Sequence, residues 1–221
     1  MLDFFLNLDT QILLAVNSVH SPYFDKWMWI VSKTLTWWIL YATLLYFFFK
    51  LGWKRALVMI VGVALLIFLC DQISASVLKP LVHRLRPSHT PGLEDVVHLV
   101  NNKRGGLYGF VSSHATNTFG AAFFVTLVFW REKIWRVIFI WPVIVCYSRM
   151  YLARHYLGDI LGGMILGGAC AALVFVLCRY AIKRLNLGNE AIMTYSKNKI
   201  LLVAMILNIL YVSVLSYFYV L

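Results

Sequence analysis

The chain alternates long apolar runs with short polar segments, and the lengths of these runs predict its secondary structure. A helix needs about 20 apolar residues to cross a hydrocarbon core about 30 Å thick. Six runs approach this length and predict transmembrane helices. They extend from about Trp29 to Phe49, Ala56 to Leu78, Ser113 to Trp130, Ile134 to Tyr151, Leu157 to Cys178 and Ile200 to Leu221.

Residues 1–20 follow a different pattern. Apolar residues recur at helical spacing, but Asp3, Asn7 and Asp9 interrupt them. This pattern favours an amphipathic helix at the membrane interface over a further span. The segment also lacks the basic start and the small-residue cleavage site of a secretory signal. We therefore predict an all-α, polytopic membrane helical bundle with about six transmembrane helices and an N-terminal interfacial helix, forming one domain over residues 1–221.

The composition supports a membrane protein. Of the 221 residues, 62% are hydrophobic and 13% are charged, against about 45–50% and about 25% in soluble domains. A globule of this size could not hide so much apolar surface from water, which excludes a soluble enzyme and a disordered chain. Four cysteines lie inside apolar runs without metal-ligand spacing, and we expect them to be small buried hydrophobes. They are Cys70, Cys146, Cys170 and Cys178.

Lys and Arg outnumber Asp and Glu by 20 to 9, which makes the net charge +11. No basic run is interleaved with exposed aromatics, so we expect no nucleic-acid partner. Alternate connections between the predicted spans instead hold eleven of the twenty cations, and such an excess in short loops marks the cytoplasmic side. These cations are Lys50, Lys54, Arg55, Arg131, Lys133, Arg136, Arg179, Lys183, Arg184, Lys197 and Lys199.

Most of the other nine cations lie in two connections on the opposite side, 79–112 and 150–156. The first connection is the only long polar segment of the chain, and with its border it contains four of the six histidines. We therefore expect any chemistry at the extracytoplasmic ends of the helices.

The first of three polar clusters on this side surrounds Lys79 and Arg86. These residues are seven apart, which on a helix is close to two turns on one face. Two cations so placed would clamp an anion with several charges, and Pro87 would end the helix just beyond them. The plainer explanation is that basic side chains extend to the membrane border.

The second cluster, Val111-Ser112-Ser113-His114, opens the third apolar run. Serine is a favoured N-cap, a helix N-terminus presents free N–H groups to an anion, and a histidine beside it can act as a general acid. In the third cluster His155 and Asp159 are one helical turn apart, so the carboxylate can fix the tautomer of the imidazole. Arg149 adds an anion donor. An ordinary capped helix and an interfacial ion pair are the plainer explanations here.

In chain order the three clusters read K-x6-R-P, S-x-H and S-R-x5-H-x3-D. This pattern resembles the three-part signature of the type-2 phosphatidic acid phosphatase superfamily, the histidine phosphatases related to vanadium haloperoxidases. The resemblance covers residues 79–159 and extends to the helical layout on either side. It implies a lipid phosphatase of the bacterial inner membrane with its site on the periplasmic face, whose partners are a lipid phosphate and the bilayer. The oligomeric state stays open.

The resemblance assigns a role to each matching residue. His155 would be the nucleophile that becomes a transient phosphohistidine, Asp159 would orient it, and His114 would protonate the departing oxygen and then activate water. The resemblance implies no metal or other cofactor, because cations and helix N-termini can stabilise the charge of a phosphoryl group. The residues that would hold the phosphate oxygens are Lys79, Arg86, Ser112, Ser113 and Arg149.

One motif departs from the family pattern, which usually reads Pro-Ser-Gly-His. This chain has Val111 and Ser113 in place of the proline and the glycine. Ser113 can still donate its backbone N–H if the position needs no positive φ, which only glycine adopts cheaply. The replacement leaves the reaction type unchanged and the subgroup open.

Some polar residues lie outside the motifs. The segment 88–110 is long for a membrane loop, and it either recognises the head group or serves as a solvated spacer. Asp71, inside the second span, either forms a helix-packing hydrogen bond or supports the site from behind. His83, Arg84 and Arg154 flank motif residues but match no motif position, so they are left out of the predicted site.

The substrate is less determined than the reaction. The polar segment 88–110 suits a large head group and favours lipid A phosphate or undecaprenyl diphosphate over phosphatidylglycerol phosphate and phosphatidic acid. A phosphotransferase would pass the phosphoryl group to a second lipid instead of water. A transporter with this fold would need no nucleophile, so His155, His114 and Asp159 argue against that class.

Overall fold

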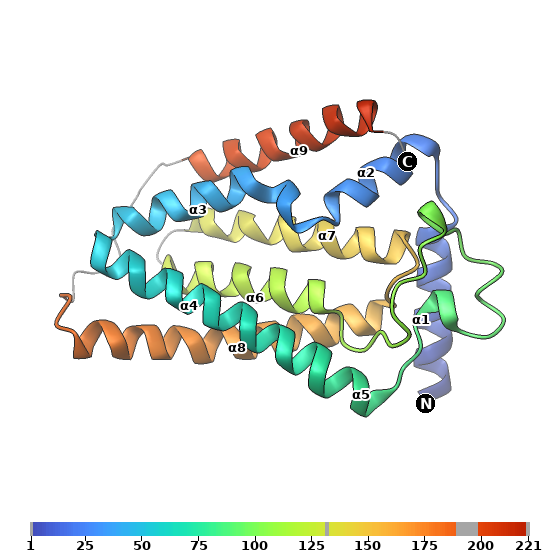
Figure 1. Cartoon of the computed structure of the whole chain (residues 1–221), viewed down its shortest axis with the longest axis horizontal. Helices are drawn as coiled ribbons and strands as arrows, with labels where there is room; N and C mark the ends of the chain where they lie inside the picture. The colour runs from blue at the N-terminus through green and yellow to red at the C-terminus, as the bar shows by residue number, and fades with distance from the viewer. Residues whose placement is uncertain (1, 131–132, 189–198, 220–221) are drawn as a thin grey trace.

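A computed structural model of the chain describes residues 2–130, 133–188 and 199–219. These residues form helices, turns and loops with one isolated β-bridge and no strand, which confirms the all-α prediction. The long helices lie side by side in one bundle, and α1 crosses one end of it (Figure 1). In chain order the α-helices are α1 Leu2–Asn17, α2 Pro22–Val31, α3 Trp38–Lys50, α4 Trp53–Asp71, α5 Lys79–Val82, α6 Ser113–Val128, α7 Ile140–Tyr151, α8 Leu157–Arg184 and α9 Ile200–Phe218.

Each predicted span coincides with helical structure, but several differ in length or continuity. The first is bent by 77° between α2 and the segment 34–50. The second continues from α4 through a π-helical segment, Gln72–Leu78, into α5. The fourth begins with a 3-10 segment, Lys133–Phe139. The end of the sixth, residues 220–221, lies outside the described residues.

Three helices among the described residues are long and apolar enough to cross a membrane. They are Trp53–Val82, Leu157–Arg184 and Ile200–Phe218, and the bent pair would make a fourth. At 16 residues, α6 falls short of the length of about 20 that a membrane crossing requires. The protein is therefore an apolar helical bundle of membrane type, and the number of six spans stays a prediction.

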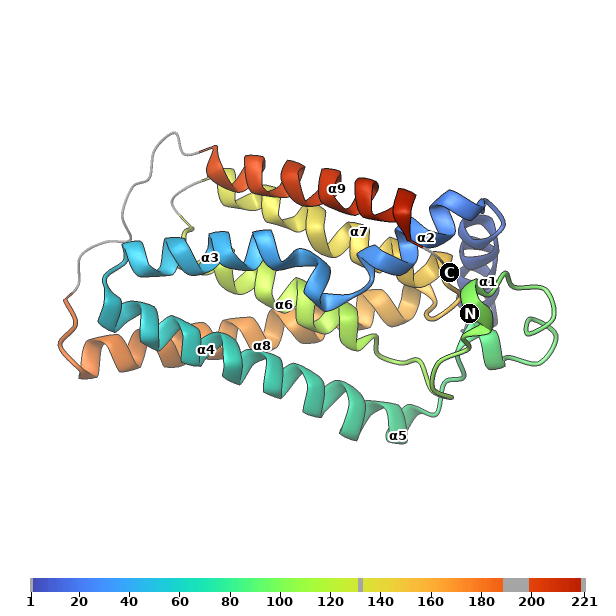
Figure 2. The same ribbon diagram turned by 45° about the horizontal axis from the view of Figure 1, so that its top comes forward.

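The predicted cytoplasmic cations gather at one end of the bundle. This end holds the α3–α4 turn, the end of α8 and the start of α9, whereas the other end holds α1, the connection after α5 and the starts of α6 and α8 (Figures 1 and 2). Arg131 and Lys197 lie outside the described residues. All predicted site residues belong to the second end, so the bundle separates the two groups of cations along its length.

Small residues set the closest helix contact, between α6 and α8. A Cβ added to Gly163 would lie 2.8 Å from the carbonyl oxygen of Ser112, and one added to Gly167 would collide with the carbonyl oxygen of Thr116. Glycines therefore let the two backbones touch, as in many membrane helix pairs. The four cysteines are free and buried, which confirms their prediction as packing residues.

The helix α1 packs against the second end through its inward face. Leu13 is fully buried, and the Asn17 side chain donates hydrogen bonds to the backbone oxygens of His98 and Tyr151. Val97 and Val100 of the long connection are buried too. Part of the segment 88–110 is therefore packed against the fold, whereas residues 101–107 are exposed. Its two interpretations, head-group recognition and a solvated spacer, both stay predictions.

Candidate active site

The first motif has a different backbone from the predicted one. The helix ends at Val82, where His83 adopts a left-handed conformation with φ 55°, and Arg86 follows in extended chain before Pro87. The prediction that Lys79 and Arg86 share a helix face ended by Pro87 is therefore wrong. The helical conformation is disfavoured for the residue that precedes a proline, here Arg86. The extended chain forms hydrogen bonds with the segment 107–109 instead. The Gly109 N–H donates to the Arg84 carbonyl at 2.8 Å, and the Arg86 N–H donates to the Leu107 carbonyl at 3.0 Å.

The π-helical segment brings the first motif to the second. Its wider turn joins the Lys79 N–H to the Ser74 carbonyl, five residues earlier. The Ser113 hydroxyl then lies 2.8 Å from both the Lys79 Nζ and the Ser74 Oγ. Ser113 is the first residue of α6 and needs no positive φ. The serine that replaces the family's glycine is thus accommodated, and its hydroxyl contacts the first motif.

Ser112 is the N-cap of α6, as its residue type predicts. Its side chain is fully buried and accepts a weak hydrogen bond, 3.4 Å, from the Ala115 N–H. Its own N–H donates to the backbone carbonyl of Asp159 at 3.0 Å, which joins the second motif to the third. His114 follows in the first turn of α6, within electrostatic range of Arg149 and His155. A direct phosphate contact of the Ser112 hydroxyl stays a prediction.

His155 and Asp159 meet at the start of α8. His155 precedes the helix, and its Nδ1 lies 3.4 Å from the Asp159 Oδ2. This separation exceeds an ordinary hydrogen bond, and such contacts often tighten only when substrate binds. The Asp159 Oδ2 also accepts a hydrogen bond from the Tyr156 N–H at 3.1 Å. The carboxylate is therefore held in place at the helix N-terminus and faces the imidazole.

Arg84, which the motif comparison left out, belongs to this site. Its guanidinium donates to the Asp159 Oδ1 at 2.8 Å and to the Asp9 Oδ2 at 2.6 Å. Asp9 also accepts the Gly158 N–H at 2.9 Å. A buried acid on α1 thus connects through Arg84 to the carboxylate beside His155. The sequence contained one signal for this connection, because Asp9 is an acidic residue among the apolar positions of an amphipathic helix.

Four cations lie around His155, and none of these cations has a carboxylate partner in the described part of the chain. They are Lys79, Arg86, Arg149 and Arg154, none of which forms a salt bridge there. The Nε atoms of Arg149 and Arg154 are buried and make no hydrogen bond. Burial and the nearby charge of Arg154 lower the pKa of Arg86. Like charges held this close need an anion to offset their repulsion.

Gly105 brings the long connection over these cations. It has φ +82°, and a Cβ there would collide with the guanidinium of Arg154 and lie 2.9 Å from that of Arg86. Glycine is required on both counts, because the backbone conformation is left-handed and the approach is close. Arg154 therefore joins Arg84 as a site residue that the motif comparison missed.

The environment keeps His155 uncharged. The side chain is 2% exposed, and burial followed by the charges of Arg86, Arg149 and Lys79 lowers its pKa well below the ordinary value. A neutral imidazole retains the lone pair that a nucleophile needs. The site thus combines a neutral nucleophile with a cationic surround, which is the electrostatic requirement for attack on a phosphate group.

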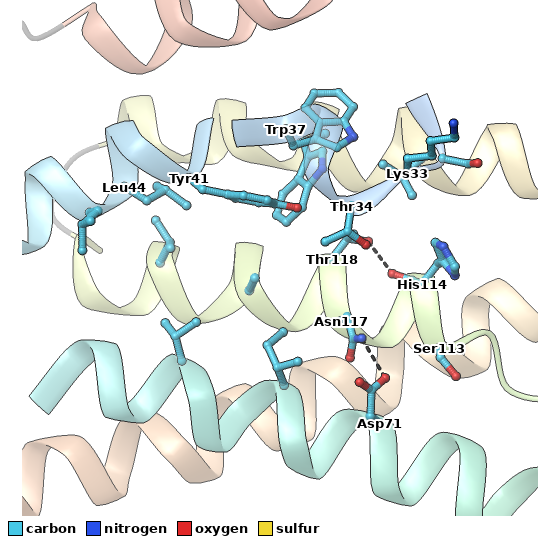
Figure 3. A pocket seen from close by; sticks show the side chains of 18 of the residues that line it. Lys33, Thr34, Trp37, Tyr41, Leu44, Asp71, Ser113, His114, Asn117 and Thr118 are labelled. Atoms are coloured by element: carbon cyan, nitrogen blue, oxygen red, sulfur yellow. Dashed lines mark hydrogen bonds between the residues drawn. The ribbon is translucent and has the colours of Figure 1, made fainter. Parts of the chain in front are cut away.

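A cavity of about 520 Å³ adjoins this site on the side of His114. It lies where α3 and α4 diverge from their common turn, and α6 forms its floor (Figures 1 and 3). One end is polar, with Lys33, Asp71 and Asn117, and the other is lined by apolar side chains such as Phe48 and Val125. Its shape and lining suit an amphiphile with its polar end near His114.

Comparison with known sequences places this constellation in a family. The chain belongs to the PAP2 superfamily, whose sequence profile matches residues 55–183. All three motifs lie within this range, whereas Asp9 and the rest of α1 lie before it.

Two curated relatives are similar over most of the chain. The lipid A 4'-phosphatase of Bacteroides thetaiotaomicron is 41% identical over 190 residues, which cover 84% of this chain and 84% of the relative. The lipid A 4'-phosphatase of Porphyromonas gingivalis is 36% identical and covers 83% and 78%. The crystal structure of Aquifex aeolicus LpxE aligns with a TM-score of 0.57 and 23% identity, over 76% of this chain and 95% of that one. This structural likeness supports the fold.

Proposed function

We propose that this protein is an integral membrane phosphatase that removes a phosphate group from lipid A. The observation that carries the proposal is the neutral, buried His155 enclosed by cations without carboxylate partners. The two curated relatives, both lipid A 4'-phosphatases, support the choice of lipid. They favour it over the other family substrates that the motifs leave open.

The reaction proceeds in two displacements. Since the His155 Nδ1 faces Asp159, Nε2 attacks phosphorus, forming an N–P bond as the ester P–O bond breaks. The bound phosphate offsets the charge of Arg149 near His114 and lets this histidine take up a proton. His114 gives that proton to the departing lipid oxygen and then takes one from water. The resulting hydroxide displaces His155 from phosphorus and releases inorganic phosphate, so both histidines return to their starting state. Arg86, Arg149 and Lys79 stabilise the charge on the equatorial oxygens in each step.

The bundle also provides a route for the lipid. Substrate enters laterally between α3 and α4, places its phosphate near His114 and extends a chain into the adjoining cavity. The end of the bundle that carries α1 faces the periplasm, because the opposite end carries the cations of the short loops. In this arrangement α1 lies at the membrane surface and the remaining helices provide six crossings.

The proposal is tested by phosphate release from purified protein with lipid A and a panel of other lipid phosphates. We expect lipid A to be preferred, His155→Ala to abolish turnover, and excess chelator to leave it unchanged. Lys183→Ala, which removes an exposed cation at the opposite end of the bundle, is the control. Full activity of His155→Ala would refute the mechanism. Transfer of label to a second lipid instead of release would identify a phosphotransferase.

A further inference from the structure

The break between α2 and α3 is held by a set of side-chain hydrogen bonds. The chain turns by 77° between α2 and the segment 34–50, and such a break leaves buried backbone groups without their helical partners. The Thr36 Oγ1 donates to the Ile30 carbonyl at 2.7 Å, and the Trp37 Nε1 donates to the Val31 carbonyl at 2.9 Å. The break is therefore a stable feature of the fold.

Asn208 on α9 supports the other side of this break. Its side chain is fully buried, its Nδ2 donates to the Thr36 carbonyl at 2.6 Å, and its Oδ1 accepts the Leu40 N–H at 3.1 Å. A buried amide with both ends bonded to backbone holds that backbone in one geometry. Asn208 lies beyond residues 55–183, which match the family profile, so none of the motifs accounts for this contact.

One carbonyl of the break, that of Ser32, lies beside the predicted general acid. Among the described residues, no backbone N–H donates to this carbonyl, and it is within hydrogen-bonding reach of the His114 imidazole. Ser32, Lys33 and Thr34 line one pocket together with His114. A ring N–H that donates to a backbone carbonyl fixes the tautomer of the imidazole and leaves the other ring nitrogen for proton transfer.

Asp71, the carboxylate that lines the adjoining cavity, has a different partner. The Asn117 Nδ2 donates to the Asp71 Oδ1 at 2.8 Å, which confirms the predicted helix-packing hydrogen bond. Figure 3 shows this pair between α6 and α4, whereas His114 lies on the side of α6 that faces Thr34. In the described part of the chain His114 forms no salt bridge. The Ser32 carbonyl therefore takes the orienting role that a carboxylate would otherwise have.

We infer that Asn208 is a positioning residue for His114, because it holds the break in the shape that sets the Ser32 carbonyl against the imidazole. The inference rests on the proposed function and adds a source of orientation from outside the motifs. Without Asn208 the break relaxes and the imidazole turns away from the departing oxygen. Proton donation becomes slower, while His155 and the phosphate-binding cations, which lie on other elements, stay in place.

The test uses two single-chain phosphomonoesters that differ in their need for an acid. Dodecyl phosphate releases an alkoxide that requires a proton, whereas 4-dodecanoylphenyl phosphate releases a stabilised phenolate that does not. We expect Asn208→Leu, which keeps the side-chain size, to lower kcat/KM about tenfold for the alkyl ester and less than about threefold for the aryl ester. His114→Gln should show the same selectivity more strongly. A merely structural role would lower kcat/KM for both esters alike.

Ser213→Ala is the matched control, because the Ser213 Oγ also joins α9 to α2, through the Trp27 Nε1 at 3.2 Å, but lies away from the break. Its kcat/KM should equal that of the wild type for both esters. Thr36→Val, which removes the donor to the Ile30 carbonyl, provides an independent variant should Asn208→Leu fail to fold, and the same selective loss is expected.

Equal losses on the two esters, or no loss on either, in Asn208→Leu and Thr36→Val would overturn the positioning role. Failure of the wild type to release phosphate from lipid A and from both esters would instead overturn the phosphatase function.

Discussion

At the level of single residues, Asp159 depends on groups that its own motif does not contain. Arg84 bridges it to Asp9, and both salt bridges are shorter than 3 Å and largely shielded from water. Charge-assisted hydrogen bonds of this kind fix geometry as well as charge. Asp9 is therefore a positioning residue, which acts on His155 through Arg84 and Asp159.

We expect Asp9→Asn to lower kcat about tenfold, the equivalent of about 1.4 kcal/mol of transition-state stabilisation. KM should change little, because Asp9 contacts neither the cavity nor any of the four cations without carboxylate partners. The measurement is steady-state phosphate release, and Asp3→Asn, an exposed acid of the same helix, is the control. Asp9→Glu should restore part of the activity. Equal kcat for Asp9→Asn and the wild type would refute the positioning role.

The electrostatics of His155 predict its pH dependence. Burial and the cations lower its pKa, so the neutral, reactive form persists as pH falls through about 6.5, the ordinary histidine value. The acidic limb of kcat/KM, which reports the free enzyme, should therefore lie well below that pH. Removing a nearby cation raises the pKa of His155. The acidic limb of the pH profile should therefore move to higher pH in Arg86→Gln but not in Lys103→Gln. The same substrate is used throughout, so that its own titration cancels.

At the level of elements, the contact between α6 and α8 holds the second and third motifs together. Ser112 and Asp159 lie at the starts of these two helices and are joined by a backbone hydrogen bond. The glycines further along α8 let the helices approach closely enough for that bond to form. Helix packing in the middle of the bundle thus sets the geometry at its end.

Gly167→Ala should destabilise the protein by about 1–3 kcal/mol, the usual cost of overpacking. Its Cβ would collide with the Thr116 carbonyl oxygen and lie 2.8 Å from the Gly120 N. Gly168→Ala is the matched control, because its Cβ would meet only the Phe123 ring, no closer than 3.4 Å. Thermal unfolding in detergent should show a lower Tm for Gly167→Ala alone. The same Tm for both variants would contradict this account of the contact.

At the level of the whole molecule, the asymmetry of charge predicts orientation. The four native cysteines are buried, so an introduced cysteine reports its own exposure. Lys103→Cys, at the end that carries the site, should react with a membrane-impermeant maleimide in intact spheroplasts. Lys183→Cys, at the opposite end, should react only after the membrane is permeabilised. The reverse pattern would place the site in the cytoplasm.

The sequence by itself determined the helical class, the approximate positions of the helices and the three motifs. It could do so because apolar runs of membrane length and short motifs are local properties that need no knowledge of neighbours. It also predicted that His155 lies beside Asp159, although His155 precedes α8 and is not one helical turn before Asp159 on that helix. Residues 1–20 were predicted to be helical. The acidic residue among their apolar positions was the one signal of a buried contact, and it did not indicate which residue Asp9 meets.

Only the tertiary structure decided how these parts meet. The break after Val82, the contact of Ser113 with Lys79 and the bridge from Asp9 through Arg84 to Asp159 join residues far apart in the chain. Such contacts depend on how helices pack and on where backbone groups find partners, which no local pattern contains. The motifs thus predicted the reaction type. The contacts that position the site residues and the cavity beside them arise only when the helices pack together.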